Sequence, residues 1–161
     1  MSTGRTTLAV LTAGLIVTCA EASAAELSPE AARGQYLVRI AGCNDCHTEG
    51  YALANGAVEE SKWLTGDALG WRGPWGTTYS ANLRLTAAST SAEEFVVLSR
   101  SPLRPPMPFF NLRAMTDADV KAIYAYLRHL GPAGKPAPAY VPPDKTPAGP
   151  FVLFPAPPPA H

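Results

Sequence analysis

The chain has 161 residues, a length that suits one compact domain with an additional segment. It carries 13 Lys and Arg against 13 Asp and Glu, so its formal net charge at pH 7 is zero. Binding to phosphate backbones relies on a surplus of basic residues, so this balance argues against a nucleic acid as partner.

The N-terminus has the pattern of a secretory signal peptide, predicted over residues 1–24. Arg5 supplies the positive start, residues 8–17 form a short apolar stretch, and Ala22-Ser23-Ala24 supplies the small residues of a cleavage site. The apolar stretch is too short to span a bilayer comfortably, and no later segment is apolar enough to cross one. We therefore expect a periplasmic protein with no membrane span in the mature chain. An uncleaved anchor and a lipid-modified Cys19 are the alternatives.

A first helix is predicted to begin at Ser28-Pro29-Glu30 and to carry an apolar side that includes Tyr36, Leu37 and Ile40. Ser28 suits the N-cap, Pro29 suits the first helical position, and Glu30 lies near the positive end of the helix dipole. Gly42 can end this helix just before the first cysteine of the mature chain.

The segment after this helix reads Cys-Asn-Asp-Cys-His, the C-x-x-C-H pattern of covalent haem attachment. Positions three apart lie on one face of a helical turn, so Cys43 and Cys46 can form thioethers with the two vinyl groups of one porphyrin. His47 follows directly, and its imidazole can bind the haem iron. The intervening Asn44 and Asp45 are expected to point away from the ring, so that they can vary without touching it.

Other uses of closely spaced cysteines fit this chain less well. A thioredoxin-like dithiol needs a preceding strand and a βαβ frame, whereas the approach here is helical. A zinc site needs four ligands, but the mature chain offers two cysteines and the histidines His47, His129 and His161. A two-haem peroxidase is excluded by the single motif. The sequence therefore predicts one covalently attached haem c as the cofactor.

Residues 48–88 show little periodicity and many glycines, so we expect loops over the haem edge. Within them, Arg72 and Trp75 are candidate contacts of the haem propionates, with simple loop packing as the alternative. A second helix is predicted from a capping box at Ser91 to about Arg100.

The second axial ligand of the iron has to come from further along the chain. Met107 lies in a Pro-Pro-Met-Pro segment, which the prolines hold extended and which suits a rigid loop. Met115 immediately precedes an expected helix cap at Thr116, where an apolar residue commonly packs on the first turn. The sequence favours Met107 and leaves Met115 and an open or histidine-filled position as alternatives.

A third helix is predicted from Thr116 to Leu130, because its apolar residues follow the i, i+3, i+4, i+7 spacing of a buried face. A Gly-Pro pair ends it. His129 falls in its last turn and is expected on the surface or in packing rather than on the iron.

Three helices and long loops around one haem predict an all-α domain over residues 25–131. Residues 132–161 are rich in proline and predict an extended tail. Within this tail, residues 151–154 are too apolar for a free linker, so we expect the tail to lie on the protein's own surface as a strap. A strand that docks on a partner is the alternative.

Taken together, these residues resemble the class I cytochrome c superfamily over roughly residues 29–131. Within it, the chain looks most like the cytochrome subunits of bacterial membrane-bound alcohol, gluconate and aldehyde dehydrogenases. Those subunits typically carry several haem domains and a membrane anchor, whereas this chain has one motif. The resemblance rests on Arg33–Leu37 leading into Cys43–His47, on Gly76–Leu83, on Met107–Phe109, on Thr116–Asp119 and on Ala122–Leu127.

The resemblance implies that the N- and C-terminal helices cross and that haem is held between histidine and methionine. It also implies a close helix contact of Gly34 with Tyr124 or Tyr126. An iron with both axial positions filled has no place for substrate, so we expect an electron carrier and not an enzyme. Its predicted partners are a donor, such as a dehydrogenase, and a respiratory acceptor such as an oxidase. The alternative is a haem enzyme or a gas or redox sensor with an open sixth position.

Overall fold

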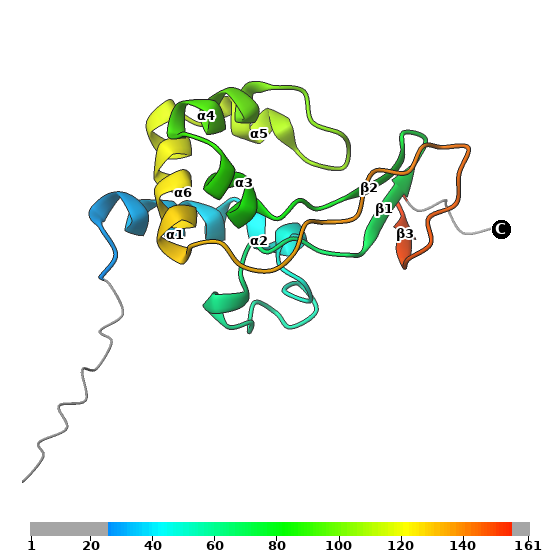
Figure 1. The fold of residues 1–161 in the computed structure, drawn as a ribbon, viewed down its shortest axis with the longest axis horizontal. Coiled ribbons are helices and arrows are strands. Elements are labelled where there is room, and N and C mark those ends of the chain that lie inside the picture. Colours follow the sequence, from blue (N-terminus) through cyan, green and yellow to red (C-terminus); the bar gives the residue numbers. More distant parts are fainter. Residues whose placement is uncertain (1–25, 156–161) are drawn as a thin grey trace, which may run out of the picture.

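The computed structural model of the protein describes residues 26–155, so the predicted signal peptide lies outside the described residues. Figure 1 shows a helical body that carries a small sheet at one end. No helix of the described part is long and apolar enough to cross a membrane. In chain order the elements are α1 (Pro29–Ile40), α2 (Cys43–His47), the 3₁₀ turn η1 (Glu60–Lys62), β1 (Gly70–Gly73), β2 (Gly76–Tyr79), α3 (Leu83–Ser89), α4 (Ala92–Arg100), α5 (Phe109–Ala114), α6 (Asp117–Leu130) and β3 (Phe151–Leu153).

The three predicted helices are confirmed as α1, α4 and α6, each with the cap that the sequence indicates. The side chain of Ser28 accepts a hydrogen bond from the Ala31 N–H, and Ser91 and Glu94 form the capping box of α4. Thr116 caps α6 by accepting from the Asp119 N–H. These local contacts satisfy backbone donors that the first helical turn leaves unpaired.

Helices α1 and α6 pack against each other at Gly34. A Cβ at this position would lie 2.0 Å from the Ala122 carbonyl oxygen and 2.9 Å from the Cβ of Tyr126, so only glycine permits this approach. The implied glycine contact is therefore made to Tyr126, and Gly34 also approaches the backbone of Ala122. Burial of the facing apolar stripes supplies the stabilisation of the crossing. The most deeply buried apolar residues are Val38, Leu64, Ala87, Val120, Tyr126 and Leu127.

The expectation of an all-α fold is wrong, because the described residues also form a three-stranded sheet in the order β2-β1-β3. β1 and β2 pair antiparallel, with Gly70 opposite Tyr79. Three of the eight residues in these two strands are glycine, so no alternation of apolar and polar residues could be read from the sequence. The segment that was expected to be loops also contains α3, capped by Asn82.

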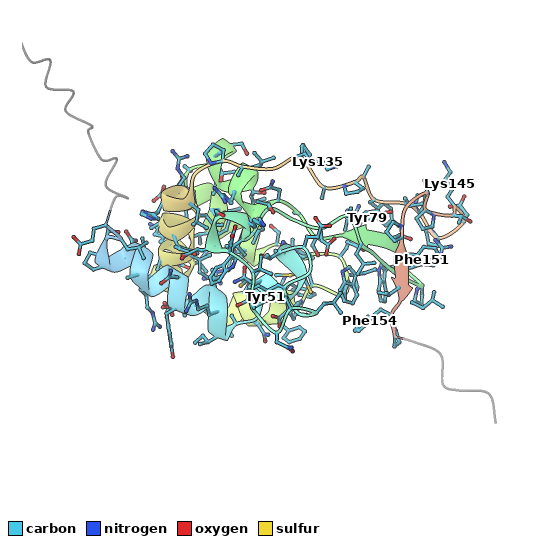
Figure 2. All side chains as sticks on the ribbon, turned by 90° about the horizontal axis from the view of Figure 1, so that it is seen from below. Tyr51, Tyr79, Lys135, Lys145, Phe151 and Phe154 are labelled. Atoms are coloured by element: carbon cyan, nitrogen blue, oxygen red, sulfur yellow. The ribbon has the colours of Figure 1, made fainter. Side chains whose placement is uncertain are left out.

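The tail runs from the end of α6 back to this sheet (Figure 2). Strand β3 pairs parallel with β1, with Gly70 opposite Phe151 and Arg72 opposite Leu153. Before it, Val141 exchanges two backbone hydrogen bonds with Thr77, of 2.7 and 3.0 Å. The apolar segment therefore packs on the body of the same chain, although β3 itself stays partly exposed.

Candidate haem site

One cavity brings together most of the residues that the sequence singled out. Its volume is about 400 Å³, and residues of α2, β2, the helices α3 to α6 and the segment before α5 line it. Cys43, Cys46 and His47 lie on its wall together with Met107. The remaining wall is mostly apolar, as a porphyrin face requires, and includes Leu83, Phe95, Leu98, Leu112, Val120 and Ile123.

Helix α2 positions the three residues of the attachment motif. Its N-cap is Gly42, whose φ of +70° belongs to the left-handed region that favours glycine. This turn lets the chain leave α1 and begin a new helix immediately, so that Cys43 and Cys46 both lie against the cavity. Both cysteines are free thiols and partly buried.

The two thiols are not activated as a redox pair would be. Burial raises the pKa of the Cys43 thiol to about 11. Burial also raises the pKa of Cys46, and the neighbouring carboxylates Asp45 and Asp67 add to this rise. Reactive dithiols have a lowered pKa that produces thiolate near neutral pH. The thiols of this chain therefore suit attachment points better than a thioredoxin-like function.

The ring of His47 is held by a hydrogen bond at Nδ1, which leaves Nε2 free. Its Nδ1 lies 2.7 Å from the carbonyl oxygen of Ala81. A carbonyl can only accept, so Nδ1 carries the proton and donates it, which leaves the lone pair of Nε2 available to a metal. Burial lowers the pKa of His47, so the ring is neutral. A neutral imidazole whose other nitrogen is held by a carbonyl is the usual arrangement of a metal ligand.

Asn44 does not line the cavity, as expected, but it is buried on the other face of α2. It is only 1% exposed, and its Oδ1 accepts a hydrogen bond of 2.8 Å from the Thr48 hydroxyl. The Thr48 oxygen in turn accepts a hydrogen bond of 2.8 Å from the Leu64 N–H. Substitution of Asn44 should nevertheless be costly, because the face of α2 that points away from the cavity packs against a neighbouring segment. Asp45, by contrast, is exposed as expected.

Of the two candidate methionines, only Met107 lines the cavity. Met115 packs against the hydrophobic core, and its backbone carbonyl accepts a hydrogen bond from Arg100 at 3.0 Å. His129 is exposed at the end of α6. The geometry therefore favours Met107 over Met115 and His129 as a candidate ligand.

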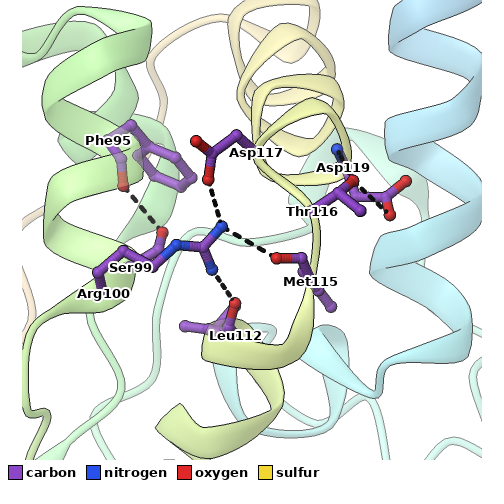
Figure 3. Close-up of polar contacts among 8 residues, drawn as sticks. All are labelled: Phe95, Ser99, Arg100, Leu112, Met115, Thr116, Asp117 and Asp119. Atoms are coloured by element: carbon purple, nitrogen blue, oxygen red, sulfur yellow. Dashed lines mark hydrogen bonds and ion pairs between the residues drawn. The ribbon is translucent and has the colours of Figure 1, made fainter.

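Arg100 joins the helices that follow the segment with Met107, as its contacts with Leu112, Met115 and Asp117 show (Figure 3). The Arg100 guanidinium donates to the carbonyl oxygens of Leu112 and Met115 and to the carboxylate of Asp117, the last at 2.6 Å. In return, Arg113 donates to the Arg100 carbonyl oxygen at 3.1 Å. The end of α4, the end of α5 and the start of α6 are thus joined at one side chain.

The structure does not bring Arg72 and Trp75 to the cavity wall. Arg72 donates instead to the carbonyl oxygens of Pro143 and Lys145 in the tail. The Nε1 of Trp75 is buried without a hydrogen-bond partner among residues 26–155, and so is the hydroxyl of Thr78. Thr78 does line the cavity. Sequence reasoning missed it, because the short strand that aims it at the cavity gave no readable pattern.

These observations fit a covalently bound haem. The cavity presents two thiols at the required spacing, a neutral imidazole with a free Nε2, and a thioether from a separate segment. Its walls are mostly apolar, and the unpaired hydroxyl of Thr78 offers one hydrogen bond to a polar group inside. This donor set matches the covalent and axial attachments of haem c.

Comparison with known proteins also indicates a haem-binding cytochrome. The chain is 31% identical over 124 residues to the fructose dehydrogenase cytochrome subunit of Gluconobacter japonicus, covering 68% of this chain and 23% of that protein. It is 28% identical over 110 residues to the cytochrome c subunit of the quinone alcohol dehydrogenase of Gluconobacter oxydans, covering 60% and 20%. It is also 30% identical over 118 residues to the corresponding cytochrome c subunit of Gluconacetobacter polyoxogenes, covering 65% and 23%.

The chain spans less than a quarter of the length of each of these curated relatives. The largest share of a relative that it covers is 23%. No solved structure matches it. The model of the family described as cytochrome c matches residues 31–131, which include the whole attachment motif, Met107 and the crossing of α1 with α6. The chain therefore belongs to the cytochrome c family: it is an electron-transfer cytochrome with covalently attached haem c.

Proposed function

We propose that this chain is a periplasmic monohaem electron carrier that takes electrons from a dehydrogenase and passes them to a respiratory acceptor. Cys43 and Cys46 would attach the haem, and His47 and Met107 would bind its iron. The observation that carries this proposal is that one cavity gathers both cysteines and both ligands from separate segments.

The chemistry is that of the cofactor, and the chain tunes it. When bound, haem c supplies a reversible one-electron change at iron, and methionine ligation raises its potential. The bond from His47 Nδ1 to the Ala81 carbonyl orients the imidazole toward the cavity. The apolar wall excludes water and lowers the local dielectric, a second lever on the potential. With both axial positions occupied, no position is left for a substrate, so the chain is not itself an enzyme.

Two further observations support the periplasmic location and a dehydrogenase as the electron donor. Residues 1–24 have the pattern of a cleaved secretory signal, which suits a haem protein matured outside the cytoplasm. The relatives compared above are named as cytochrome subunits of dehydrogenases, which makes a dehydrogenase the proposed donor. Haem domain and tail, residues 25–131 and 132–161, form one functional unit in this proposal.

The test is the visible absorption spectrum of the full chain, expressed with the machinery that attaches haem c. It is recorded in both oxidation states, before and after carbon monoxide is added. We expect a low-spin spectrum with the ferric methionine–iron charge-transfer band and no shift with carbon monoxide. A high-spin spectrum that shifts with carbon monoxide would contradict the proposal and would indicate a haem enzyme or sensor.

A further inference from the structure

The tail touches the segment that carries Met107. The Arg104 guanidinium lies over the ring of Tyr140, with its carbon 4.2 Å from the ring centroid. Arg104 lines the cavity beside Met107, and its carbonyl oxygen accepts a hydrogen bond from the Met107 N–H at 3.3 Å. Arg104 and Met107 therefore belong to one turn, and Tyr140 contacts that turn from the side of the tail.

Tyr140 is itself fixed on the sheet. Its hydroxyl donates to the carbonyl oxygen of Trp75 at 2.7 Å. The next residue, Val141, makes the paired backbone hydrogen bonds to Thr77. A Cβ at Gly76 would lie 2.4 Å from the Val141 carbonyl oxygen and 2.8 Å from the Tyr140 hydroxyl, so the tail lies directly on the hairpin. The ring over Arg104 is thus held at its hydroxyl and at the backbone beside it.

The hairpin of β1 and β2 also contributes to the cavity wall near His47, the other proposed iron ligand. Thr78 and Tyr79 of β2 line the cavity, and the chain then reaches Ala81, whose carbonyl accepts from His47. The segment between α4 and α5 reaches away from the helical body toward this sheet (Figure 1). One stretch of tail therefore links the wall behind His47 to the turn that carries Met107.

We propose that Tyr140 is a positioning residue for the axial methionine. Its ring holds Arg104, and Arg104 holds the turn in which Met107 lies, so the tail restrains opening of this turn. The inference rests on the proposed function, because it takes Met107 as an iron ligand. Removing a cation–π contact at an exposed site should raise the equilibrium for methionine dissociation about two- to fivefold.

The test compares variants of the full haem-loaded chain. Imidazole, which replaces a methionine ligand on ferric iron, is titrated into Tyr140→Ala, Tyr140→Phe and wild type. We expect Tyr140→Ala to bind imidazole about two- to fivefold more tightly, since its turn opens more often. Tyr140→Phe keeps the ring and the backbone contacts of Val141 but loses the bond to Trp75, so its affinity should lie between those of wild type and Tyr140→Ala. The matched control is Tyr36→Ala, which removes a similar contact with Arg33 on α1, where Tyr36 does not line the cavity.

Amide hydrogen exchange gives a second readout that does not depend on imidazole binding. Exchange should be faster over residues 101–107 in Tyr140→Ala and unchanged over α6. If that variant does not fold, Arg104→Gln removes the same contact from the other side and should show the same increase in imidazole affinity.

Several results would overturn the inference. One is unchanged imidazole affinity and exchange in Tyr140→Ala while wild type shows its methionine–iron band, which leaves the proposed function intact. Another is an equal increase in Tyr36→Ala or in Tyr140→Phe, because the effect would then not come from the ring over Arg104. A wild type without the methionine–iron band would overturn the Met107 assignment, and the inference with it.

Discussion

The wall of the cavity that carries His47 and the segment that carries Met107 are held by different kinds of contact. His47 lies in α2, whose outer face makes buried hydrogen bonds between Asn44, Thr48 and Leu64. Met107 lies in an irregular segment, and the contacts that hold it come from arginines that are partly or fully exposed, Arg100 and Arg104. Buried hydrogen bonds are costly to break, whereas exposed ones compete with water. The difference indicates that the segment with Met107 opens more easily than α2.

The largest effect is expected where the buried contacts behind His47 are removed. Thr48→Val keeps the shape of the side chain but leaves the Leu64 N–H and the Asn44 Oδ1 without their partner. Two buried polar groups without partners should lower the free energy of unfolding by about 2–4 kcal/mol. Urea denaturation of the haem-loaded protein measures this change.

A matched substitution in the same helix sharpens this test. Asp45 is exposed within the attachment motif, so Asp45→Ala should change the stability by less than about 0.5 kcal/mol. If Thr48→Val lowered the free energy of unfolding as little as Asp45→Ala does, the buried hydrogen bonds of Thr48 would not be what holds α2.

A smaller effect on stability is expected on the side of Met107. Arg100→Gln removes the donors to the Leu112 and Met115 carbonyl oxygens at the base of the segment. Because the Arg100 side chain is 30% exposed, water replaces part of the lost hydrogen bonding. The free energy of unfolding should therefore fall by about 1 kcal/mol. The same variant should bind carbon monoxide more readily in the ferrous state.

The comparison between the two sides would fail if Arg100→Gln cost more stability than Thr48→Val, or if it left carbon monoxide binding unchanged. Arg33→Gln is a suitable control for the loss of an arginine, because Arg33 forms an ion pair with Asp119 and does not line the cavity.

Features set by local contacts could be predicted from the sequence. The caps at Ser28, Ser91 and Thr116 fixed the starts of α1, α4 and α6, because side chain and backbone meet within one turn. The attachment motif was recognisable for the same reason, since its spacing already determines which side chains share a face of α2. Met107 was favoured by the prolines around it, and its place on the cavity wall agrees with that choice.

Features set by distant parts of the chain could not be predicted. The sheet needs β3, which comes long after β1 in the chain and pairs with it in parallel, as Trp71 opposite Val152 shows. For Arg72 the sequence leaves open a propionate contact and loop packing. Nothing local reveals that carbonyl oxygens of the tail surround it instead. The burial of Asn44 could not be predicted either, because it depends on the segment around Leu64.

The proposed electron carrier depends on Met107 as the second axial ligand of the haem iron. The most direct measurement is the reduction potential of Met107→Ala beside that of Met115→Ala, with carbon monoxide binding followed in both. We predict that Met107→Ala lowers the potential and opens the ferrous iron to carbon monoxide, since the thioether is the ligand that raises the potential. Met115→Ala should do neither, because Met115 does not line the cavity. An unchanged potential in Met107→Ala would remove Met107 from the site and contradict the electron carrier proposed here.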